Sequence, residues 1–396
     1  MRLGIDLRCL PSDGSAGGGI AHAARAVTET LVGIGGCEII CYVPQNVAAP
    51  NVDAIMRLPD ARRASLVDAL RHHPCDLLFV PSGAVSPMLP VLAVPWVHDC
   101  DIFDHPEWFP QSWWKRQITT RLFLRGIRRA PHIFAASEYT KRAIERLVPS
   151  AKGRITVTGE GGDAELASIP SDGLADVKRQ AVARLIAHGI TRPFVLMLGT
   201  LEPRKNVSFI CRLWPQVAQA IAGTDLIIAG QDGWKTSPIH AAIQQCQHEL
   251  TSIDSRLILF QKKYNADCET FSEQDRRDLL LAARAVLVPS LSEGFGLVAL
   301  EAIQAGTPVL VSNRGALPEV VGEGEWLLDP EDASAWQAAI IQMLSDSAAR
   351  ERIRLAQQDR RTTHSWEQTA RIIMENIIPS PRVPPQADLL PKKTVD

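Results

Sequence analysis

The stretch Pro289 to Ala302, PSLSEGFGLVALEA, decides the fold. It follows the apolar run AVLVPS, which is typical of a buried strand, and opens a helical pattern that we expect to end near Ala305. Gly294 and Gly296 let backbone N–H groups approach a ligand closely, because glycine has no side chain. The helix that follows offers unbonded N–H groups and the positive end of its dipole to an anion. The stretch therefore predicts a strand, a turn and a helix of an α/β domain, with an anion site at the turn.

Two acids stand eight positions apart on either side of this turn. Glu293 on the loop can accept hydrogen bonds from sugar hydroxyls, and Glu301 on the helix can take the paired hydroxyls of a ribose. A carboxylate suits a diol because its two oxygens accept two O–H bonds at once. The spacing alone leaves a second interpretation open, in which one acid starts a helix and the other lies on the surface.

Short apolar runs alternate with helical patterns outside this stretch as well. A first series runs from LGIDLRCL to RITVTG near residue 160, and a second begins with PFVLMLGT at residue 193. This rhythm is typical of parallel α/β sheets. A chain of 396 residues also exceeds the size at which a single hydrophobic core stops growing. We predict two doubly wound parallel sheets, whose ligands bind outside the carboxyl ends of the strands, where two facing edges make a cleft.

Changes in composition give the expected boundaries. Apolar periodicity is lost near residue 163 and returns near residue 193, and the end of the chain, PSPRVPPQADLLPKKTVD, has five prolines and no period. We expect an N-terminal domain over 1–165, a linker over 166–192, a C-terminal domain over 193–364, a helix over 365–378 and a disordered tail over 379–396.

A second motif, GTLEPRKN, directly follows the strand PFVLML. Arg204 and Lys205 are adjacent cations at the carboxyl end of a strand, where they could grip a diphosphate without a metal ion. Asn206 is a candidate cap for the next helix. Taken in isolation, the two cations could equally be solvated loop charges.

The first series of strands contributes two weaker features. Gly14 and the run Gly17 to Gly19 follow the first strand and open a helix, where they could bring backbone close to a phosphate or could simply form a flexible turn. The run VPWVHD ends another strand, and we expect its His98 to point into the cleft. A lone histidine of this kind is more often a structural residue.

Composition limits the classes of partner. The formal net charge is −2, which predicts no nucleic-acid partner, and the eight cysteines are scattered without metal-ligand spacing, as expected of reduced cytosolic thiols. Residues 1–10 resemble a first strand rather than a signal peptide, and no apolar run is long enough to span a bilayer. We therefore expect a cytoplasmic protein that is soluble or peripheral to a membrane.

Taken together, these motifs resemble glycosyltransferase family 4. The resemblance rests on the glycine loop, the VHD strand end, SEYTK at 137–141, EPRKN, the two acids of SEGFGLVALE, ALPEV at 316–320 and Asp329-Pro330, and it covers residues 1 to about 375. The chain is most similar to bacterial O-antigen and exopolysaccharide mannosyltransferases, whose donor is GDP-mannose. The resemblance implies the GT-B architecture: two Rossmann-like domains face a cleft, the N-terminal one binding the acceptor and the C-terminal one the nucleotide sugar. It also implies that the helix over 365–378 returns to the N-terminal domain.

The resemblance also implies residue roles and a retaining mechanism. Arg204 and Lys205 match the cations that hold the donor diphosphate, Glu293 matches the acid that contacts the transferred sugar, and Glu301 matches the acid that binds ribose. His98 matches a histidine near the reacting face of the sugar. No metal and no other cofactor is implied, and Thr200 stands where many members have an arginine. The implied catalytic residues are His98, Arg204, Lys205 and Glu293, and the implied donor-binding residues are Gly18, Gly19, Gly199, Thr200, Arg204, Lys205, Glu293, Gly294, Phe295, Gly296, Leu297 and Glu301.

The segment over 108–137 has no acidic residue and is rich in basic and aromatic side chains. It could be an ordinary domain helix with solvated arginines, and its periodicity supports this in part. Adjacent tryptophans and positive charge also suit an anionic membrane surface. A polyprenyl-diphosphate-linked oligosaccharide at the inner face of the cell membrane is then the expected acceptor. Other donors such as UDP-glucose or dTDP-rhamnose, a soluble acceptor, a nucleotide-sugar 2-epimerase and a non-catalytic nucleotide-sugar-binding protein stay open as alternatives.

Overall fold

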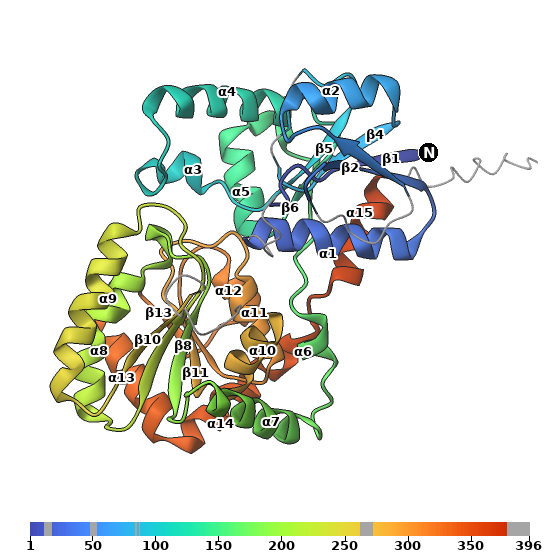
Figure 1. Ribbon diagram of the computed structural model, residues 1–396. Coiled ribbons are helices and arrows are strands. Elements are labelled where there is room, and N and C mark those ends of the chain that lie inside the picture. The colour runs from blue at the N-terminus through green and yellow to red at the C-terminus, as the bar shows by residue number, and fades with distance from the viewer. Residues whose placement is uncertain (12–17, 48–53, 84, 87, 262–271, 378–396) are drawn as a thin grey trace, which may run out of the picture.

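The computed structural model describes residues 1–11, 18–47, 54–83, 85–86, 88–261 and 272–377. In these ranges two parallel sheets with helices packed around them form two halves of the molecule (Figure 1). The prediction of two doubly wound α/β domains is confirmed. The tail predicted over 379–396 lies outside the described residues, as do Gly14 and Gly17.

The N-terminal sheet has seven strands in the order β3-β2-β1-β4-β5-β6-β7. The strands are parallel, and the central ones are apolar along their whole length because helices cover both faces. The strands are β1 Arg2–Asp6, β2 Glu38–Pro44, β3 Ile55–Leu58, β4 Leu77–Val80, β5 Ala93–Val97, β6 Ile133–Ala135 and β7 Ile155–Val157. The helices are α1 Gly19–Ile34, α2 Arg63–His72, α3 Asp101–Asp104, η1 Pro106–Trp108, α4 Trp113–Arg129, α5 Glu138–Leu147 and η2 Pro149–Ala151.

The C-terminal sheet has six strands in the order β10-β9-β8-β11-β12-β13, so β8 and β11 are central neighbours. The strands are β8 Phe194–Leu198, β9 Asp225–Ala229, β10 Leu257–Phe260, β11 Ala285–Val288, β12 Val309–Ser312 and β13 Leu327–Leu328. The helices are α6 Ala164–Ser168, α7 Leu174–Ala187, η3 Pro203–Lys205, α8 Val207–Ala220, α9 Ser237–Glu249, η4 Leu250–Ser252, α10 Glu273–Ala282, α11 Leu297–Gln304, α12 Leu317–Val321, α13 Ala333–Ser345, α14 Ser347–Gln357, η5 Gln358–Thr362 and α15 Trp366–Ile377.

The segment expected to be a linker, 166–192, is mostly α7, and this helix packs on the C-terminal domain. Leu174, Ala181 and Leu185 are buried in the same apolar cluster as β8 and β11. Arg184 of α7 donates two hydrogen bonds of 2.7 Å to the Asp278 carboxylate of α10. The segment therefore contributes to the core of the C-terminal half.

The last described helix, α15, packs along α1 of the N-terminal domain (Figure 1). Its apolar side chains Trp366, Ile373 and Ile377 are buried in the cluster that contains β1. Trp366 also donates a hydrogen bond of 2.8 Å from Nε1 to the carbonyl oxygen of Gly162. The chain thus runs through the C-terminal half and ends, within the described residues, on the N-terminal half. None of the helices in the described ranges is long and apolar enough to cross a bilayer.

Candidate active site

The predicted turn lies between β11 and α11 and faces the N-terminal domain. Gly296 has a φ of 111°, which favours glycine, and α11 begins at the next residue. A Cβ added at Gly294 would overlap the carbonyl oxygen of His98, so the two domains approach too closely here for any larger residue. Ser137 Oγ also donates a hydrogen bond of 2.6 Å to the Gly294 carbonyl oxygen. The helix start thus lies at the junction of the domains.

Glu293 is the centre of a buried charge cluster at this turn. Its carboxylate accepts hydrogen bonds from Arg204 Nη1 at 2.8 Å, Lys205 Nζ at 2.5 Å and Ser290 Oγ at 2.7 Å. Burial alone would raise the pKa of Glu293, but the charges of Lys205 and Arg204 and these hydrogen bonds lower it to about 2. The carboxylate is therefore ionised at any physiological pH and serves as an acceptor of hydrogen bonds.

The two predicted phosphate-binding cations are paired with carboxylates. Arg204 Nε lies 2.5 Å from Glu202 Oε1, in addition to its bond with Glu293. A guanidinium has five N–H donors and an ammonium has three, so both side chains keep donors for phosphate oxygens. Asn206 does not cap α8 with its side chain; its amide instead donates to the carbonyl oxygens of Pro289 and Pro330 at 3.2 and 3.1 Å. This amide joins the cation loop to the loop that carries Glu293.

A small pocket opens beside this cluster at the carboxyl ends of β8 and β11. Its lining includes Gly199, Thr200, Lys205, Ser290 and Glu293. Gly199 has a φ of 129°, which turns the chain sharply at the end of β8. The sequence-predicted residues of the two loops therefore share one site.

The glycine segment of the N-terminal domain lies across from the start of α11. A Cβ added at Gly19 would lie 3.8 Å from Leu297 Cδ1, and Gly18 precedes the first turn of α1. Two helix starts, those of α1 and α11, thus lie close together. Both offer unbonded N–H groups, as a diphosphate site requires.

His98 is buried and does not present a free ring nitrogen to the cleft. Nδ1 lies 2.5 Å from Glu160 Oε1, and Nε2 lies 2.6 Å from the carbonyl oxygen of Pro81. Burial would lower the pKa of His98, but the hydrogen bond and charge of Glu160 raise it above its ordinary value. Because both ring nitrogens face acceptors, this arrangement favours the charged imidazole, which can donate from both. The expectation that this side chain points into the cleft is wrong, since the domain interior holds it.

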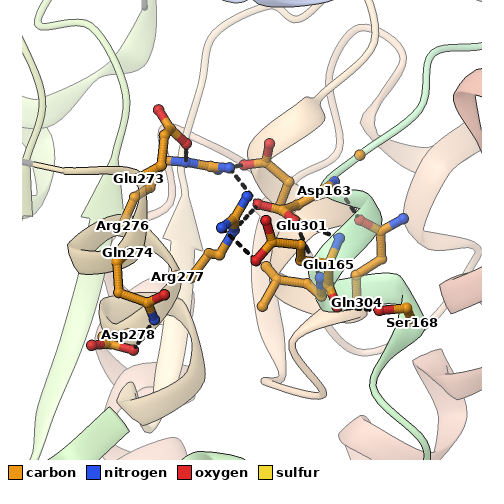
Figure 2. A network of polar contacts seen from close by, with 12 residues as sticks. Asp163, Glu165, Ser168, Glu273, Gln274, Arg276, Arg277, Asp278, Glu301 and Gln304 are labelled. Atoms are coloured by element: carbon orange, nitrogen blue, oxygen red, sulfur yellow. Dashed lines mark hydrogen bonds and ion pairs between the residues drawn. The ribbon is translucent and has the colours of Figure 1, made fainter. Parts of the chain in front are cut away.

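Glu301 lies on α11, at 4% exposure, inside a second charge cluster (Figure 2). Arg276 Nη1 of α10 donates to Glu301 Oε2 at 2.5 Å. Burial raises the pKa of Glu301, and the charges of Arg276 and His22 act against that rise. The predicted ribose acid is therefore held by an arginine from a neighbouring helix.

Two further carboxylates join the domains. Asp101 accepts a hydrogen bond of 2.8 Å from Ser292 Oγ, and its Oδ2 atom is buried without a hydrogen-bond partner among the described residues. Burial, followed by the charge of Asp99, raises the pKa of Asp101 to about 6. Glu319 accepts from the backbone N–H groups at the start of α5, those of Glu138 and Tyr139, at 2.8 and 2.7 Å. No cluster of His, Cys, Asp and Glu in the described ranges is suited to hold a metal ion.

The family of glycosyl transferases, group 1, matches residues 186–360, the part of the chain that carries Arg204, Glu293 and Glu301. The chain contains a glycosyltransferase group 1 domain. The E. coli O-antigen chain mannosyltransferase B is 28% identical over 261 residues, which are 65% of this chain and 63% of that protein. The chain spans less than two thirds of the length of this relative and of several other curated relatives that it matches.

Solved structures resemble the whole described fold. Anabaena Alr3699/HepE in complex with UDP and glucose has a TM-score of 0.69 at 16% identity, covering 94% of this chain and 98% of that one. WaaG, a glycosyltransferase involved in lipopolysaccharide biosynthesis, has a TM-score of 0.67 at 16% identity, covering 96% of this chain and 100% of WaaG. The GT-B architecture expected from the motifs is confirmed.

Sequence reasoning missed the partners that hold the predicted residues. These are Glu160 for His98, Glu202 for Arg204, Ser292 with Asp101 across the domain junction, and Arg276 for Glu301 in the group 1 domain. Glu202 lies in the EPRKN motif and Ser292 in the stretch that carries Glu293, whereas Glu160 and Arg276 lie in the charged runs GEGGD at 159–163 and DRRD at 275–278. Neither run belongs to a recognised motif, and their side chains contact their partners only in the folded protein.

Proposed function

We propose that this chain is a metal-independent, retaining glycosyltransferase that transfers mannose from GDP-mannose to an acceptor hydroxyl. One observation carries the proposal. Glu293 is held by Arg204 and Lys205 beside the start of α11, and the Gly18–Gly19 segment of the other domain lies opposite. This arrangement supplies cations, helix N–H groups and an ionised acceptor of hydroxyl bonds in one place, as a nucleotide diphosphate sugar requires.

In this proposal the diphosphate lies between Arg204, Lys205 and the first turn of α11. The bond between the sugar C1 and the diphosphate oxygen breaks, and the new bond to the acceptor oxygen forms on the same face. The departing diphosphate takes the acceptor proton. The cations stabilise the negative charge that develops on the leaving group, and a fixed charge of this kind is worth about 2.7–4 kcal/mol of barrier. Glu293 accepts hydrogen bonds from hydroxyls of the transferred sugar.

In this mechanism, closure of the two domains protects the donor from water. Contacts from Ser137 to Gly294, from Asp101 to Ser292 and from Glu319 to α5 join the halves around the turn. A closed junction excludes the water that would otherwise hydrolyse the donor.

For the acceptor we propose a polyprenyl-diphosphate-linked oligosaccharide at the inner face of the cell membrane, with α4 facing anionic lipid. The face of α4 that packs on the domain uses Phe123 and Ile127. The other face leaves Trp113 at 53%, Trp114 at 70% and Ile118 at 59% exposure. The basic residues Lys115, Arg121, Arg125 and Arg128 are exposed on the same helix. Core packing thus accounts for only part of the apolar stripe, and the remainder suits a membrane surface.

A donor panel tests the proposal. Purified protein is heated with GDP-mannose, UDP-glucose and dTDP-rhamnose, and the nucleotide sugar that it uses should raise the melting temperature. The same compound should then transfer its sugar to membrane lipid extracts. A protein stabilised by none of them, or one that only epimerises the donor, would contradict the proposal.

A further inference from the structure

Arg276 stands at the centre of the second charge cluster, where it joins three acids from separate parts of the chain (Figure 2). Nη1 donates to Glu301 Oε2 at 2.5 Å, Nη2 donates to Asp163 Oδ2 at 2.8 Å, and Nε donates to Glu273 Oε2 at 2.8 Å. The Arg276 side chain is 14% exposed. All three nitrogens of the guanidinium are thus engaged, which fixes its position.

The contact with Glu301 has an electrostatic consequence. Burial favours the neutral form of Glu301, and Arg276 supplies the largest opposing charge. A protonated acid has a hydrogen on one oxygen and loses part of its capacity to accept from a diol, whereas an ionised one has about four acceptor positions. Arg276 therefore favours the ionised form of this buried carboxylate, which is the form that a ribose needs.

The same contact leaves free acceptor positions on Glu301 for the ribose. Arg276 bonds only Oε2 of Glu301, and no side chain or backbone group in the described ranges donates to Oε1. The carboxylate is thus held from one side. Oε1 and the second lone pair of Oε2 can take the two hydroxyls.

Asp163 connects this arrangement to the segment that joins the two sheets. Its carboxylate caps α6 by accepting from the N–H groups of Glu165 and Leu166 at 2.9 and 3.2 Å. Its backbone N–H donates to Gln304 Oε1 at the end of α11 at 2.9 Å. The anchor of Arg276 is therefore fixed at both its side chain and its backbone.

We propose that Arg276 is a positioning residue of the donor site, which keeps Glu301 ionised and correctly oriented for the ribose diol of the nucleotide. This inference rests on the proposed function, because the ribose role of Glu301 comes from the resemblance to glycosyltransferases. Arg276 does not touch the sugar that is transferred. Its effect reaches the nucleotide through Glu301.

Arg277 is a matched control, because it lies next to Arg276 and binds the same Asp163 oxygen at 2.7 Å without contacting Glu301. Its other contact is with the exposed acid Glu165 at 2.6 Å. A variant at Arg277 therefore disturbs the anchor but leaves the ribose acid paired. Any effect specific to Arg276 is then an effect on Glu301 or on Glu273, its other partner.

The test measures calorimetric affinities for GDP and UDP and for their 2′,3′-dideoxy analogues, which lack the diol. The wild-type protein should prefer the diol form of its nucleotide about tenfold, as for a hydrogen bond to a charged group. Arg276→Met should remove this preference, and its affinity for the diol form should recover as the pH is raised, because a higher pH favours the ionised form of Glu301. Arg276→Lys keeps the positive charge and should retain part of the preference for the diol form. It replaces the methionine variant in the test if that variant does not fold. Arg277→Met should behave as wild type.

The outcomes separate the inference from the proposed function. The inference alone would be overturned if folded Arg276→Met still preferred the diol form as the wild type does. It would also be overturned if Arg276→Met and Arg277→Met lost equal affinity for both forms of the nucleotide. A wild-type protein that binds neither nucleotide, or a Glu301→Gln variant that binds the diol form as the wild type does, would overturn the assigned ribose site and the inference with it.

Discussion

Glu293 and Glu301 are both buried carboxylates of one turn, yet their surroundings drive their pKa values in opposite directions. Glu293 has two cations and a hydroxyl around it, and its pKa falls to about 2. Glu301 has one arginine that it shares with Asp163 and Glu273, and burial keeps its pKa raised. The two acids therefore differ in charge environment as well as in assigned role.

These environments predict different kinetic effects. Glu301→Ala should raise the KM for the donor about tenfold with little change in kcat, because it removes binding energy that is present before the reaction. Glu293→Ala and Lys205→Ala should lower kcat about a hundredfold, because they act on the charge that develops in the transition state. Steady-state kinetics with the accepted donor checks this. Wild-type rates in all three folded variants would contradict the site.

The His98–Glu160 pair predicts a pH dependence of stability. The folded pKa of His98 is raised above 6.5, so its contribution to stability is complete below pH 6.5 and is lost as pH rises through the folded pKa. Glu160→Gln should destabilise the protein by about 3 kcal/mol, because it breaks a buried ion pair. The difference between wild type and variant should shrink as pH rises from about 6 to 9. Urea unfolding across this range measures it, and a difference that does not vary with pH would refute the assignment.

At the residue scale, the sequence predicts the groups that belong to a motif and misses those that hold them. Arg204, Lys205 and Glu293 come together as expected, because each follows a strand of the same sheet. Arg276 and Asp163 are 113 positions apart, and they meet only when α10 packs beside the segment between the sheets. No local pattern encodes such a contact.

Among the elements, α15 closes the fold by packing on α1. Trp366→Ala should cost about 3–5 kcal/mol, because the ring is buried at 6% exposure and its N–H is bonded to Gly162. Deleting residues from Ser365 onward should destabilise the protein more, whereas deleting 379–396 should be harmless. Chemical denaturation of the three variants checks this. A truncation at Ser365 that unfolds like the parent would contradict the packing argument.

The exposed face of α4 predicts salt-dependent membrane binding. The protein should float with anionic liposomes at low salt and not with neutral ones, because each engaged basic residue adds about 1 kcal/mol. Trp113→Ala/Trp114→Ala should weaken the binding, while Phe123→Leu on the buried face should leave it unchanged. If the protein does not bind anionic liposomes even at low salt, α4 is ordinary domain surface and a soluble acceptor replaces the lipid-linked one.

Element types were predictable from the sequence, but their packing partners were not. The charged pattern of 166–192 indicated a helical connection, while the burial of Leu174, Ala181 and Leu185 depends on α10 far along the chain. Asn206 was expected to cap α8, yet its φ of 56° and its two carbonyl contacts place its side chain elsewhere. In both cases contacts with residues far along the chain determine where the side chains lie.

At the scale of the whole molecule, two parallel sheets bring the carboxyl ends of β8 and β11 towards the N-terminal domain. The periodicity of the sequence sufficed to predict this architecture, because strands covered on both faces are apolar along their length. The detailed fit of the halves was not predictable. It depends on Gly294, where any side chain would overlap the carbonyl oxygen of His98, and on the hydrogen bond from Ser292 to Asp101.

The central claim is that Arg204, Lys205 and the start of α11 do the work of a metal ion in sugar transfer. The most direct measurement is transfer of radiolabelled mannose from GDP-mannose to membrane lipid extract, with excess EDTA, for the wild type and for Lys205→Ala. We expect the same wild-type rate with and without EDTA and a rate about a hundredfold lower for the variant. Loss of wild-type activity in EDTA that magnesium restores would contradict it.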